Sequence, residues 1–264
     1  LLFIGAVLLF VACAVNPFTG KKTLALVPNS QILPMAFQQY DQFLEENDEK
    51  IVNGTSESQM VKNVGQDIAR AADRYLNANG YENYLQNYRW EFNLIQNESA
   101  NAWALPGGKV MVYTGILDIA INDAMLAAIM GHEIAHALAN HGQQRMSAAQ
   151  LQQLGAVAGS IAFEENQQIF ATAYGLGSQL GIMLPFSRSN ETEADKIGLT
   201  LMAIAGYDPQ EAVDLWQRMK AEGGAQPPEF LSTHPSYNTR INNLQAWVDD
   251  AKATARKFGV TSFR

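Results

Sequence analysis

The sequence predicts an α+β fold that is predominantly helical, with a small β-sheet or hairpin beside one long apolar helix. Apolar residues recur at helical spacing over most of the chain, two short extended runs flank a Gly-Gly pair, and a strongly apolar helix follows them. With 264 residues, 47% of them hydrophobic and 17% charged, the chain can bury a substantial core. This composition excludes an intrinsically disordered protein.

Charge and cysteine content exclude further classes. The chain has 18 Lys and Arg against 26 Asp and Glu, a net charge of -8. Binding to nucleic acid needs a basic surface that releases counterions, so we expect no nucleic-acid partner. Because Cys13 is the single cysteine, the chain has no internal disulfide and no thiolate-rich metal site, and any metal must be held by His and carboxylate side chains.

The N-terminal residues predict a lipid anchor. Residues 1–12 are apolar and uncharged, as in a signal-peptide core, and they are fewer than the roughly 20 that a spanning helix needs. The run from Leu9 to Cys13 resembles the bacterial lipobox, and Ala14 resembles the sorting signal of outer-membrane lipoproteins. We expect the protein to be held at the outer membrane by a lipid on Cys13, facing the periplasm. The alternative is an ordinary cysteine in a cleaved leader.

The predicted organisation is a lipoprotein-type signal peptide at residues 1–12, a tether at 13–30 and a single domain at 31–264. No internal repeat or second domain boundary emerges. The Gly/Ala-rich stretch from Leu154 to Leu184 is interrupted by acidic residues, and each of its pieces is short for spanning a bilayer. We interpret it as a buried helical hairpin, with membrane contact as the alternative.

The elements before the apolar helix are two helices and a group of strands. Amphipathic spacing predicts a helix from Ile32 to Leu44, and Ser56-Glu57-Ser58-Gln59 has the form of a capping box that opens a second helix. Residues 89–95 alternate apolar and polar side chains, which favours a strand. Residues 102–113 form two extended runs around Gly-Gly, which indicates a β-hairpin.

A helical, strongly apolar pattern runs from Asp118 to about Arg145 and contains the motif H-E-x-x-H, residues 132–136. His132 and His136 differ by roughly 40° in direction and one turn in height, so both imidazoles can reach one ion. Glu133 lies on the same side, where it can take a proton from a water held by the metal. Such polar groups on a buried helix are costly unless something neutralises them, which favours a metal over satisfied core histidines.

A third metal ligand must come from elsewhere in the chain. His141 lies nine residues after His132, about 180° around a continued helix. We therefore expect His141 to face away from the site and to have a surface or supporting role.

The acidic cluster at residues 187–195 supplies the better candidate. Glu191 and Asp195 are four residues apart, so one face of a helix can present Glu191 to the metal and Asp195 to an imidazole N–H. Glu193 points elsewhere on this geometry. The alternative is a favourable charge at a helix N-terminus without metal ligation.

His234 is the remaining histidine, and Pro235 restricts it to an extended backbone, so its imidazole is displayed from a loop. Near the metal it can donate to the oxyanion of the reaction intermediate, or it can occupy the open coordination position. The alternative is a histidine that only packs the loop. We predict a catalytic contribution from Glu133, Asp195 and His234.

The pattern His132-Glu133-x-x-His136 followed by Glu191-x-x-x-Asp195 resembles the gluzincin family of zinc metallopeptidases that includes HtpX and the CAAX prenyl protease. Further phrases match soluble bacterial members in the same order: Asn16-Pro17-x-Thr19-Gly20-Lys21, Asn101 to Gly108, Tyr113-Thr114-Gly115, Ser187-Arg188 and Ser232 to Ser236. The resemblance covers nearly the whole chain after Cys13.

This resemblance implies a gluzincin-like fold and zinc endopeptidase activity, with one Zn²⁺ per chain bound by His132, His136 and Glu191. It also implies substrates that are unfolded, damaged or misassembled proteins of the bacterial cell envelope, as in protein quality control. Strand 109–113 is expected to offer a free edge to an extended substrate, with a simple core hairpin as the alternative. An envelope chaperone or assembly factor that retains the zinc site is the competing hypothesis, and intact Glu133 favours the enzyme.

Overall fold

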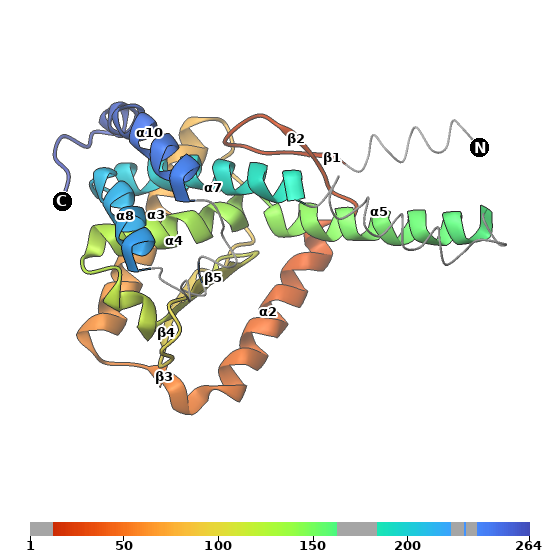
Figure 1. Cartoon of the computed structure of the whole chain (residues 1–264), viewed down its shortest axis with the longest axis horizontal. Coiled ribbons are helices and arrows are strands. Elements are labelled where there is room, and N and C mark those ends of the chain that lie inside the picture. Colours follow the sequence, from red (N-terminus) through yellow and green to blue (C-terminus); the bar gives the residue numbers. More distant parts are fainter. Residues whose placement is uncertain (1–12, 163–183, 223–229, 231–236) are drawn as a thin grey trace.

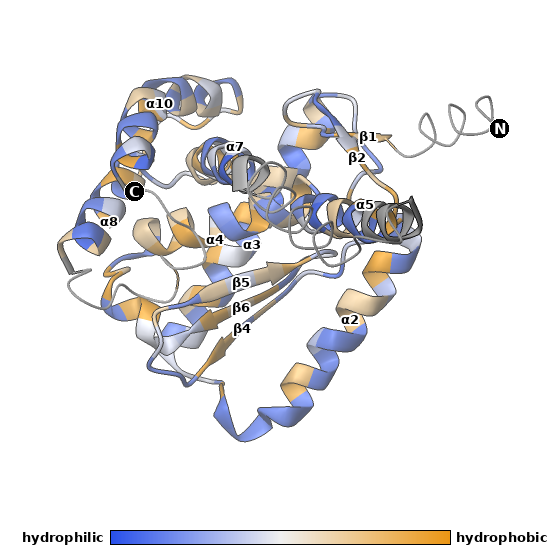
Figure 2. Cartoon of the chain, turned by 45° about the vertical axis from the view of Figure 1, so that its right-hand side comes forward, coloured by the Kyte–Doolittle hydropathy of each residue, from blue (hydrophilic) through white to orange (hydrophobic). Residues whose placement is uncertain are grey.

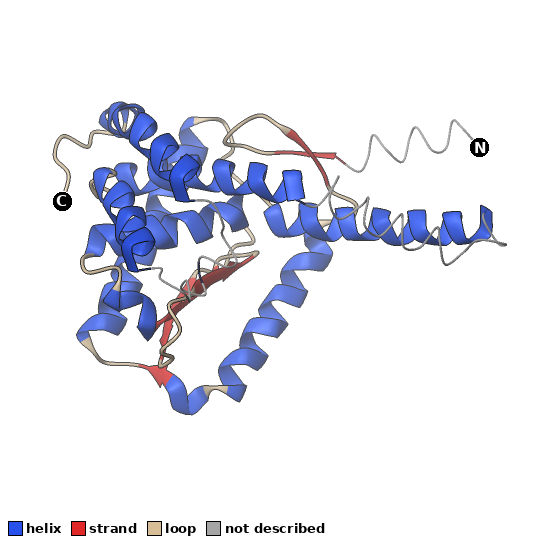
Figure 3. Ribbon diagram, in the orientation of Figure 1, coloured by secondary structure: helices blue, strands red, loops and turns tan. Residues whose placement is uncertain are grey.

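The computed structural model describes residues 13–162, 184–222, 230 and 237–264. It confirms the predicted α+β, predominantly helical fold, in which helices surround a small sheet (Figure 3). The elements are β1 (Cys13–Val15), β2 (Lys22–Leu24), α2 (Asn29–Glu46), η1 (Asp48–Lys50), β3 (Ile51–Val52), α3 (Ser56–Ala78), β4 (Glu91–Ile95), β5 (Ala102–Leu105), β6 (Lys109–Tyr113), η2 (Thr114–Asp118), α4 (Asp123–Leu138), α5 (His141–Ala162), α7 (Leu184–Ile204), α8 (Gln210–Glu222) and α10 (Tyr237–Lys257).

The main sheet has the strand order β3-β4-β6-β5. The predicted hairpin is confirmed: β5 and β6 pair antiparallel around Gly107 and Gly108, whose positive φ angles of 89° and 90° favour glycine. The predicted free edge was assigned to the wrong strand, however. β6 also pairs in parallel with β4, so it lies inside the sheet, and among the described strands β5 has β6 as its only neighbour.

The two faces of the sheet pack against different helices. Val110 and Val112 of β6 belong to the main core with α3 and α4, whereas Met111 packs with Tyr40 of α2 on the opposite face. This alternation follows from the two-residue period of a strand. Figure 2 shows α2 on one side of the sheet and α3 and α4 on the other. The sheet therefore forms a support on which α4, the helix carrying the H-E-x-x-H motif, rests.

The capping box of α3 lies one residue earlier than predicted. Thr55 is the N-cap, and its hydroxyl accepts a hydrogen bond from the backbone N–H of Ser58, 3.1 Å away. The Ser58 hydroxyl in turn accepts from the Thr55 N–H at 3.1 Å. A Ser at the third helical position thus completes a reciprocal cap that more often uses Glu or Gln.

The long helix predicted from Asp118 to Arg145 is broken at residues 139–140. Asn140 has a φ of 56°, the left-handed region that Asn tolerates better than most residues. The Tyr84 hydroxyl stabilises this break: it donates a hydrogen bond to the Leu138 carbonyl at 2.6 Å and accepts one from Asn140 Nδ2 at 2.7 Å. The chain therefore changes direction after α4, and α5 starts anew at His141.

The β1–β2 hairpin and the segment after it lie beside α5. The β1–β2 hairpin contains the buried side chains of Asn16 and Thr23, and the Leu26 N–H donates to Ser147 Oγ of α5 at 3.0 Å. Part of the segment predicted as a tether thus packs against the domain. Cys13, at its start, is exposed.

Helix α5 extends away from the rest of the molecule (Figure 1). The side chain of Leu154 on this helix is 64% exposed, so the predicted burial of the stretch from Leu154 to Leu184 is wrong at its start. Residues 163–183, the larger part of that stretch, lie outside the described residues. Within the described parts of the chain, none of the helices is both long and apolar enough to cross a membrane.

Candidate metal centre

Helices α4 and α7 approach each other closely at two glycines. A Cβ atom at Gly198 of α7 would lie 2.8 Å from the carbonyl carbon of Gly131 and from the backbone nitrogen of His132. A Cβ atom at Gly131 would lie 3.1 Å from the Gly198 carbonyl oxygen. Real Cβ atoms essentially never come as close to backbone as 2.8 Å, and 3.1 Å is tighter than most real contacts. The two glycines therefore permit the contact that brings His132 beside the acidic residues of α7.

We expect Gly198→Ala to destabilise the protein and to weaken metal binding. The added methyl group must push α7 away from α4, which costs about 1–3 kcal/mol and separates the metal-binding side chains of the two helices. Thermal unfolding and zinc titration of the purified variant measure both effects. Gly142→Ala is the matched control, because its Cβ would meet only the Pro106 side chain at 3.8 Å. Equal behaviour of the two variants would contradict the proposed role of the glycine contact.

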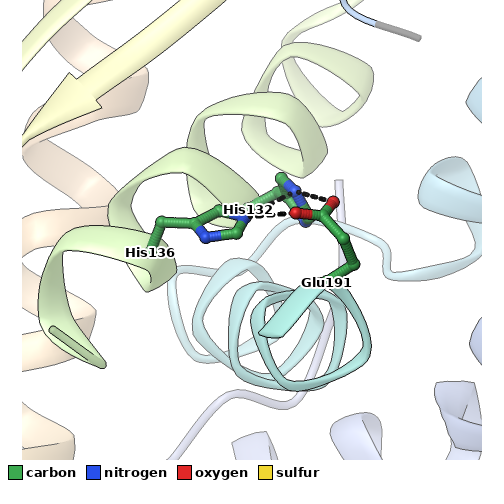
Figure 4. A group of neighbouring side chains, drawn as sticks. All are labelled: His132, His136 and Glu191. Atoms are coloured by element: carbon green, nitrogen blue, oxygen red, sulfur yellow. Dashed lines mark hydrogen bonds and ion pairs between the residues drawn. The ribbon is translucent and has the colours of Figure 1, made fainter. Parts of the chain in front are cut away.

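Three side chains from α4 and α7 meet at one point: His132, His136 and Glu191 (Figure 4). The Nε2 atoms of His132 and His136 are 3.1 Å apart. The Glu191 carboxylate lies 3.4 Å from His132 Nε2 through Oε2 and 3.3 Å from His136 Nε2 through Oε1. All three residues are buried. The structure therefore brings together the three residues that the sequence predicted as ligands.

This triangle has the dimensions of a zinc site. Ligand atoms about 2.0–2.1 Å from a tetrahedral Zn²⁺ are roughly 3.3–3.4 Å from one another, close to the observed separations. Two imidazoles and one carboxylate also form the donor set of catalytic zinc sites that keep a fourth position open. The described residues hold one cluster of this kind. The side chains present thus fit a single Zn²⁺.

Asp195 lies beside the outer nitrogen of His132, one of the predicted ligands. Its Oδ1 lies 2.8 Å from His132 Nδ1. Its Oδ2 accepts a hydrogen bond from Arg240 Nε at 2.5 Å, and another nitrogen of the same guanidinium donates to Glu191 Oε2 at 2.8 Å. Arg240, on α10, therefore bridges the predicted ligand and the predicted supporting residue, a role that the sequence analysis missed.

Arg240 is 3% exposed, and its guanidinium lies 4.1 Å from the centre of the Trp216 ring on α8. A buried arginine needs paired carboxylates and benefits from an aromatic face. The residues that attract it, Glu191 and Asp195, are one helical turn apart, so one guanidinium can span both. Their spacing is the signal in the sequence that could have indicated a cation opposite them.

The two histidines experience opposite shifts in pKa. Burial lowers the pKa of His132, but hydrogen bonds to Asp195 and Glu191 outweigh it and raise the value to about 9. Burial lowers the pKa of His136 well below its usual value. Two carboxylates thus face two cationic groups, Arg240 and the His132 imidazole. A bound metal ion would displace the proton from His132, because ligation needs the neutral ring.

Glu133 lies beside His132 on α4 and is 4% exposed. Its placement on a buried helix next to a ligand is consistent with the predicted role as general base, which stays a prediction. His234 lies outside the described residues. Of its described neighbours in sequence, Phe230 has its ring centre 6.1 Å from that of His132, and Arg240 contacts Glu191.

His141 does not face away from the site, so that expectation was wrong. Because α4 ends at Leu138, His141 starts a new helix and turns back toward the metal centre. Its Nδ1 lies 2.9 Å from His136 Nδ1, and its Nε2 lies 2.9 Å from Glu193 Oε2. Glu193 therefore contacts His141, which lies between it and His136.

The pKa shifts of His141 and Glu193 favour a neutral imidazole beside an ionised carboxylate. Burial lowers the pKa of His141, and the contact with Glu193 opposes that shift only in part. Burial raises the pKa of Glu193, but hydrogen bonds from His141 and Thr19 lower it overall. His141 is therefore neutral and Glu193 ionised near neutral pH.

Two histidines of an H-E-x-x-H helix with a glutamate from a second helix define a gluzincin-type metal centre. The family model described as Peptidase family M48 matches residues 56–248 of the chain. The chain therefore belongs to peptidase family M48, which confirms the family resemblance seen in the sequence.

Curated relatives of this chain are also named as metalloendopeptidases or proteases. The mitochondrial metalloendopeptidase OMA1 of Schizosaccharomyces pombe is 36% identical over 194 residues, which are 70% of this chain and 53% of that protein. The human metalloendopeptidase OMA1 is 28% identical over 262 residues, 95% of this chain and 48% of the relative. The β-barrel assembly-enhancing protease of Escherichia coli is 34% identical over 162 residues, 58% of this chain and 33% of the relative. The chain spans about half the length of the OMA1 relatives and a third of the E. coli protein.

Proposed function

We propose that this chain is a zinc-dependent metalloendopeptidase that cleaves unfolded polypeptides. The observation that carries the proposal is the triangle of His132, His136 and Glu191, whose separations of 3.1 to 3.4 Å match a tetrahedral zinc site. In this proposal these residues hold one Zn²⁺ per chain. Membership of family M48 and the names of the relatives support the same activity.

The residues around the metal have separate tasks. A bound Zn²⁺ would polarise the scissile carbonyl and lower the pKa of a water molecule, so that a hydroxide nucleophile would be available near neutral pH. Glu133 accepts the proton of that water and then delivers it to the leaving amine. Asp195 Oδ1 lies 2.8 Å from His132 Nδ1, and this contact directs Nε2 of the same ring toward the metal. Arg240 keeps Asp195 and Glu191 in place and balances their charge.

The edge of β5 that has no neighbour among the described strands is the proposed docking site for substrate. Tyr113 N–H donates to the Asn101 carbonyl at 3.0 Å, and hydrogen-bonded pairs alternate along an antiparallel ladder. The N–H and C=O of Ala104 therefore point away from β6. β5 lies against α4, so an extended peptide that pairs with this edge runs past the metal centre.

A cavity at the end of this edge can receive a substrate side chain. It measures about 300 Å³ and lies between α2, the end of β5 and the start of α5. Its walls include Met35, Leu105, Pro106 and Met146, and His136 also borders it. Because these walls are apolar, we propose that apolar side chains of the substrate bind there, beside the cleaved bond. Unfolded chains expose such side chains, whereas folded chains bury them.

We expect Ala104→Pro to reduce kcat/KM for an unfolded protein substrate about fivefold, the effect of losing roughly one hydrogen bond. Proline removes the outward N–H, and edge strands tolerate proline where the N–H does not join the ladder. Ala104→Ser is the matched control because it keeps the N–H. Hydrolysis of fluorescently labelled casein measures the effect. Unchanged kcat/KM in the proline variant would move substrate docking away from β5.

We further propose that the protein acts in the bacterial cell envelope, on damaged or misassembled envelope proteins, and that it is anchored to the outer membrane by lipid on Cys13. The lipobox-like run before Cys13 and the exposure of this residue support the anchor. The Escherichia coli relative is named a β-barrel assembly-enhancing protease, which supports a role in protein quality control. The OMA1 relatives are named as mitochondrial proteins.

Cys13→Ser tests the anchor. In the native bacterial host, the wild-type protein is expected in the outer-membrane fraction, because a lipoprotein's several acyl chains hold firmly where one chain gives only marginal binding. The variant is expected in the soluble fraction or in a form that retains its leader. Immunoblots of fractionated cells measure both. Wild-type protein found in the soluble periplasm would exclude the lipid anchor.

The enzymatic proposal is tested most directly with the purified protein and an unfolded substrate. Casein is expected to be degraded by zinc-loaded protein, to survive when a chelator is present and to be degraded again when zinc is restored. A protein that binds zinc and slows casein aggregation without cleaving it would support a chaperone instead.

A further inference from the structure

The two metal-binding imidazoles are held from behind by different chains of residues. His132 is backed by Asp195 and Arg240, whose side chains are both buried. His136 is backed by His141, Glu193 and Thr19, a chain that ends at an exposed residue. The second chain has no part in the chemistry proposed above, which makes its function a separate question.

The direction of every hydrogen bond in the second chain follows from the ligand. His136 turns Nε2 toward His132 and Glu191, so its Nδ1 carries the proton. That proton is donated to His141 Nδ1, and His141 must then carry its own proton on Nε2. The Nε2–H of His141 donates to Glu193 Oε2 at 2.9 Å, and the Thr19 hydroxyl donates to Glu193 Oε1 at 2.8 Å. Each donor thus has one acceptor.

The outer end of the chain lies in a loop with a defined shape. Asn16 accepts the Phe18 N–H through Oδ1 at 2.9 Å and the Gly20 N–H through its carbonyl at 2.8 Å. The ring of Phe18 stacks on that of Tyr75 of α3, with 5.1 Å between the ring centres. The loop between β1 and β2 is therefore fixed to the domain, and it presents Thr19 to Glu193.

We propose that His141 and Glu193 are positioning residues that fix the tautomer and orientation of His136, and that the β1–β2 loop supports them through Thr19. This inference rests on the proposed zinc-dependent function. Partners of this kind raise the basicity of a ligating histidine and oppose its rotation away from the metal. Because Thr19 of the β1–β2 loop donates to Glu193, this loop can influence how long the metal stays bound.

The test compares zinc release from zinc-loaded full-length variants to a chromogenic chelator, a measurement that does not depend on peptidase activity. His141→Phe keeps a ring but no hydrogen bond, and Glu193→Ala removes the acceptor. We expect both to release zinc about 10–100-fold faster than wild type. Glu193→Gln keeps an acceptor oxygen for His141, so it should restore most of the wild-type release rate. Thr19→Val should show the smallest increase.

Glu211→Ala is the matched control. The Glu211 carboxylate accepts a hydrogen bond from Asn122, the N-cap of α4, at 2.9 Å, so it contacts the same helix far from the metal ligands. This variant should release zinc at the wild-type rate. In cobalt-substituted protein, His141→Phe and Glu193→Ala should shift the visible absorption bands, whereas Glu211→Ala should not. A purely structural role would lower the melting temperature without altering these bands.

Two outcomes would overturn the inference, and they are distinguishable. Zinc release at the wild-type rate from both His141→Phe and Glu193→Ala, with unchanged cobalt spectra, would exclude a positioning role while leaving the proposed function intact. If His141→Phe fails to fold, Glu193→Ala decides alone, because the Glu193 side chain is 8% exposed whereas that of His141 is fully buried. A wild-type protein that binds no zinc would overturn the proposed function and this inference together.

Discussion

Replacement of Glu133 by Gln is expected to abolish peptide-bond hydrolysis while zinc content stays near that of the wild type. The amide has the shape of the carboxylate, but it cannot accept the proton that the attacking water must lose. General-base catalysis contributes about 10²–10⁴-fold to such reactions, so we expect casein hydrolysis to fall by at least that range. The triangle of His132, His136 and Glu191 does not include Glu133, so metal binding should persist.

Two measurements are needed for this variant. Metal analysis of the purified protein should give a zinc content equal to that of wild type, and the labelled-casein assay should give a rate near the background without enzyme. Glu211→Gln is the same chemical change on a carboxylate of α8 that contacts Asn122, at the start of α4. This variant is expected to keep normal activity. Full activity of Glu133→Gln would exclude the proposed mechanism. Loss of zinc from this variant would instead indicate that Glu133 is a metal ligand or supports the structure of the site.

The residues of the metal triangle could be predicted from sequence because their arrangement follows from local rules. His132 and His136 share one face of a helix through their spacing, and Glu191 shares a face with Asp195 through the same spacing. A buried histidine pair is costly unless a metal neutralises it, and such a metal needs a third ligand. This requirement predicted that the two helices meet. Helix periodicity was also sufficient to predict α2 and α3 and the helical character of the fold.

The surroundings of the triangle could not be predicted in this way because they depend on contacts between distant segments. The position of His141 depends on the break held by Tyr84, which lies 56 residues before Asn140. Without that break, helix geometry would place His141 on the far side, as expected from the sequence. Asn140 was the available signal, since a left-handed residue that ends a helix is often Gly or Asn.

The sheet shows the same limitation. The hairpin of β5 and β6 is local and was predicted, whereas the parallel pairing of β4 with β6 joins strands separated by a connection that also contains β5. That pairing decides which of the described strands lies at the edge of the sheet, and therefore where we propose that substrate docks. Gly131 and Gly198 are likewise far apart in the sequence, and the sequence alone does not indicate that they contact each other.

Removal of the third ligand is expected to eliminate metal and activity together. Glu191→Ala deletes the carboxylate that lies 3.4 Å from His132 Nε2 and 3.3 Å from His136 Nε2, and two imidazoles alone make a poor zinc site. The variant should contain far less zinc than wild type after dialysis, and casein hydrolysis should fall with it. His136→Ala should behave alike.

Glu191→Ala also removes one of the two carboxylates that balance Arg240, whose guanidinium donates to both Glu191 and Asp195. An uncompensated buried charge lowers stability, so unfolding must be measured beside metal content. Glu191→Gln serves as the second variant, since it retains an oxygen for Arg240 while weakening metal ligation. We expect Glu191→Gln to fold with a melting temperature closer to that of wild type and still to bind zinc weakly. A folded Glu191→Ala protein with tight, stoichiometric zinc would place the third ligand on another residue.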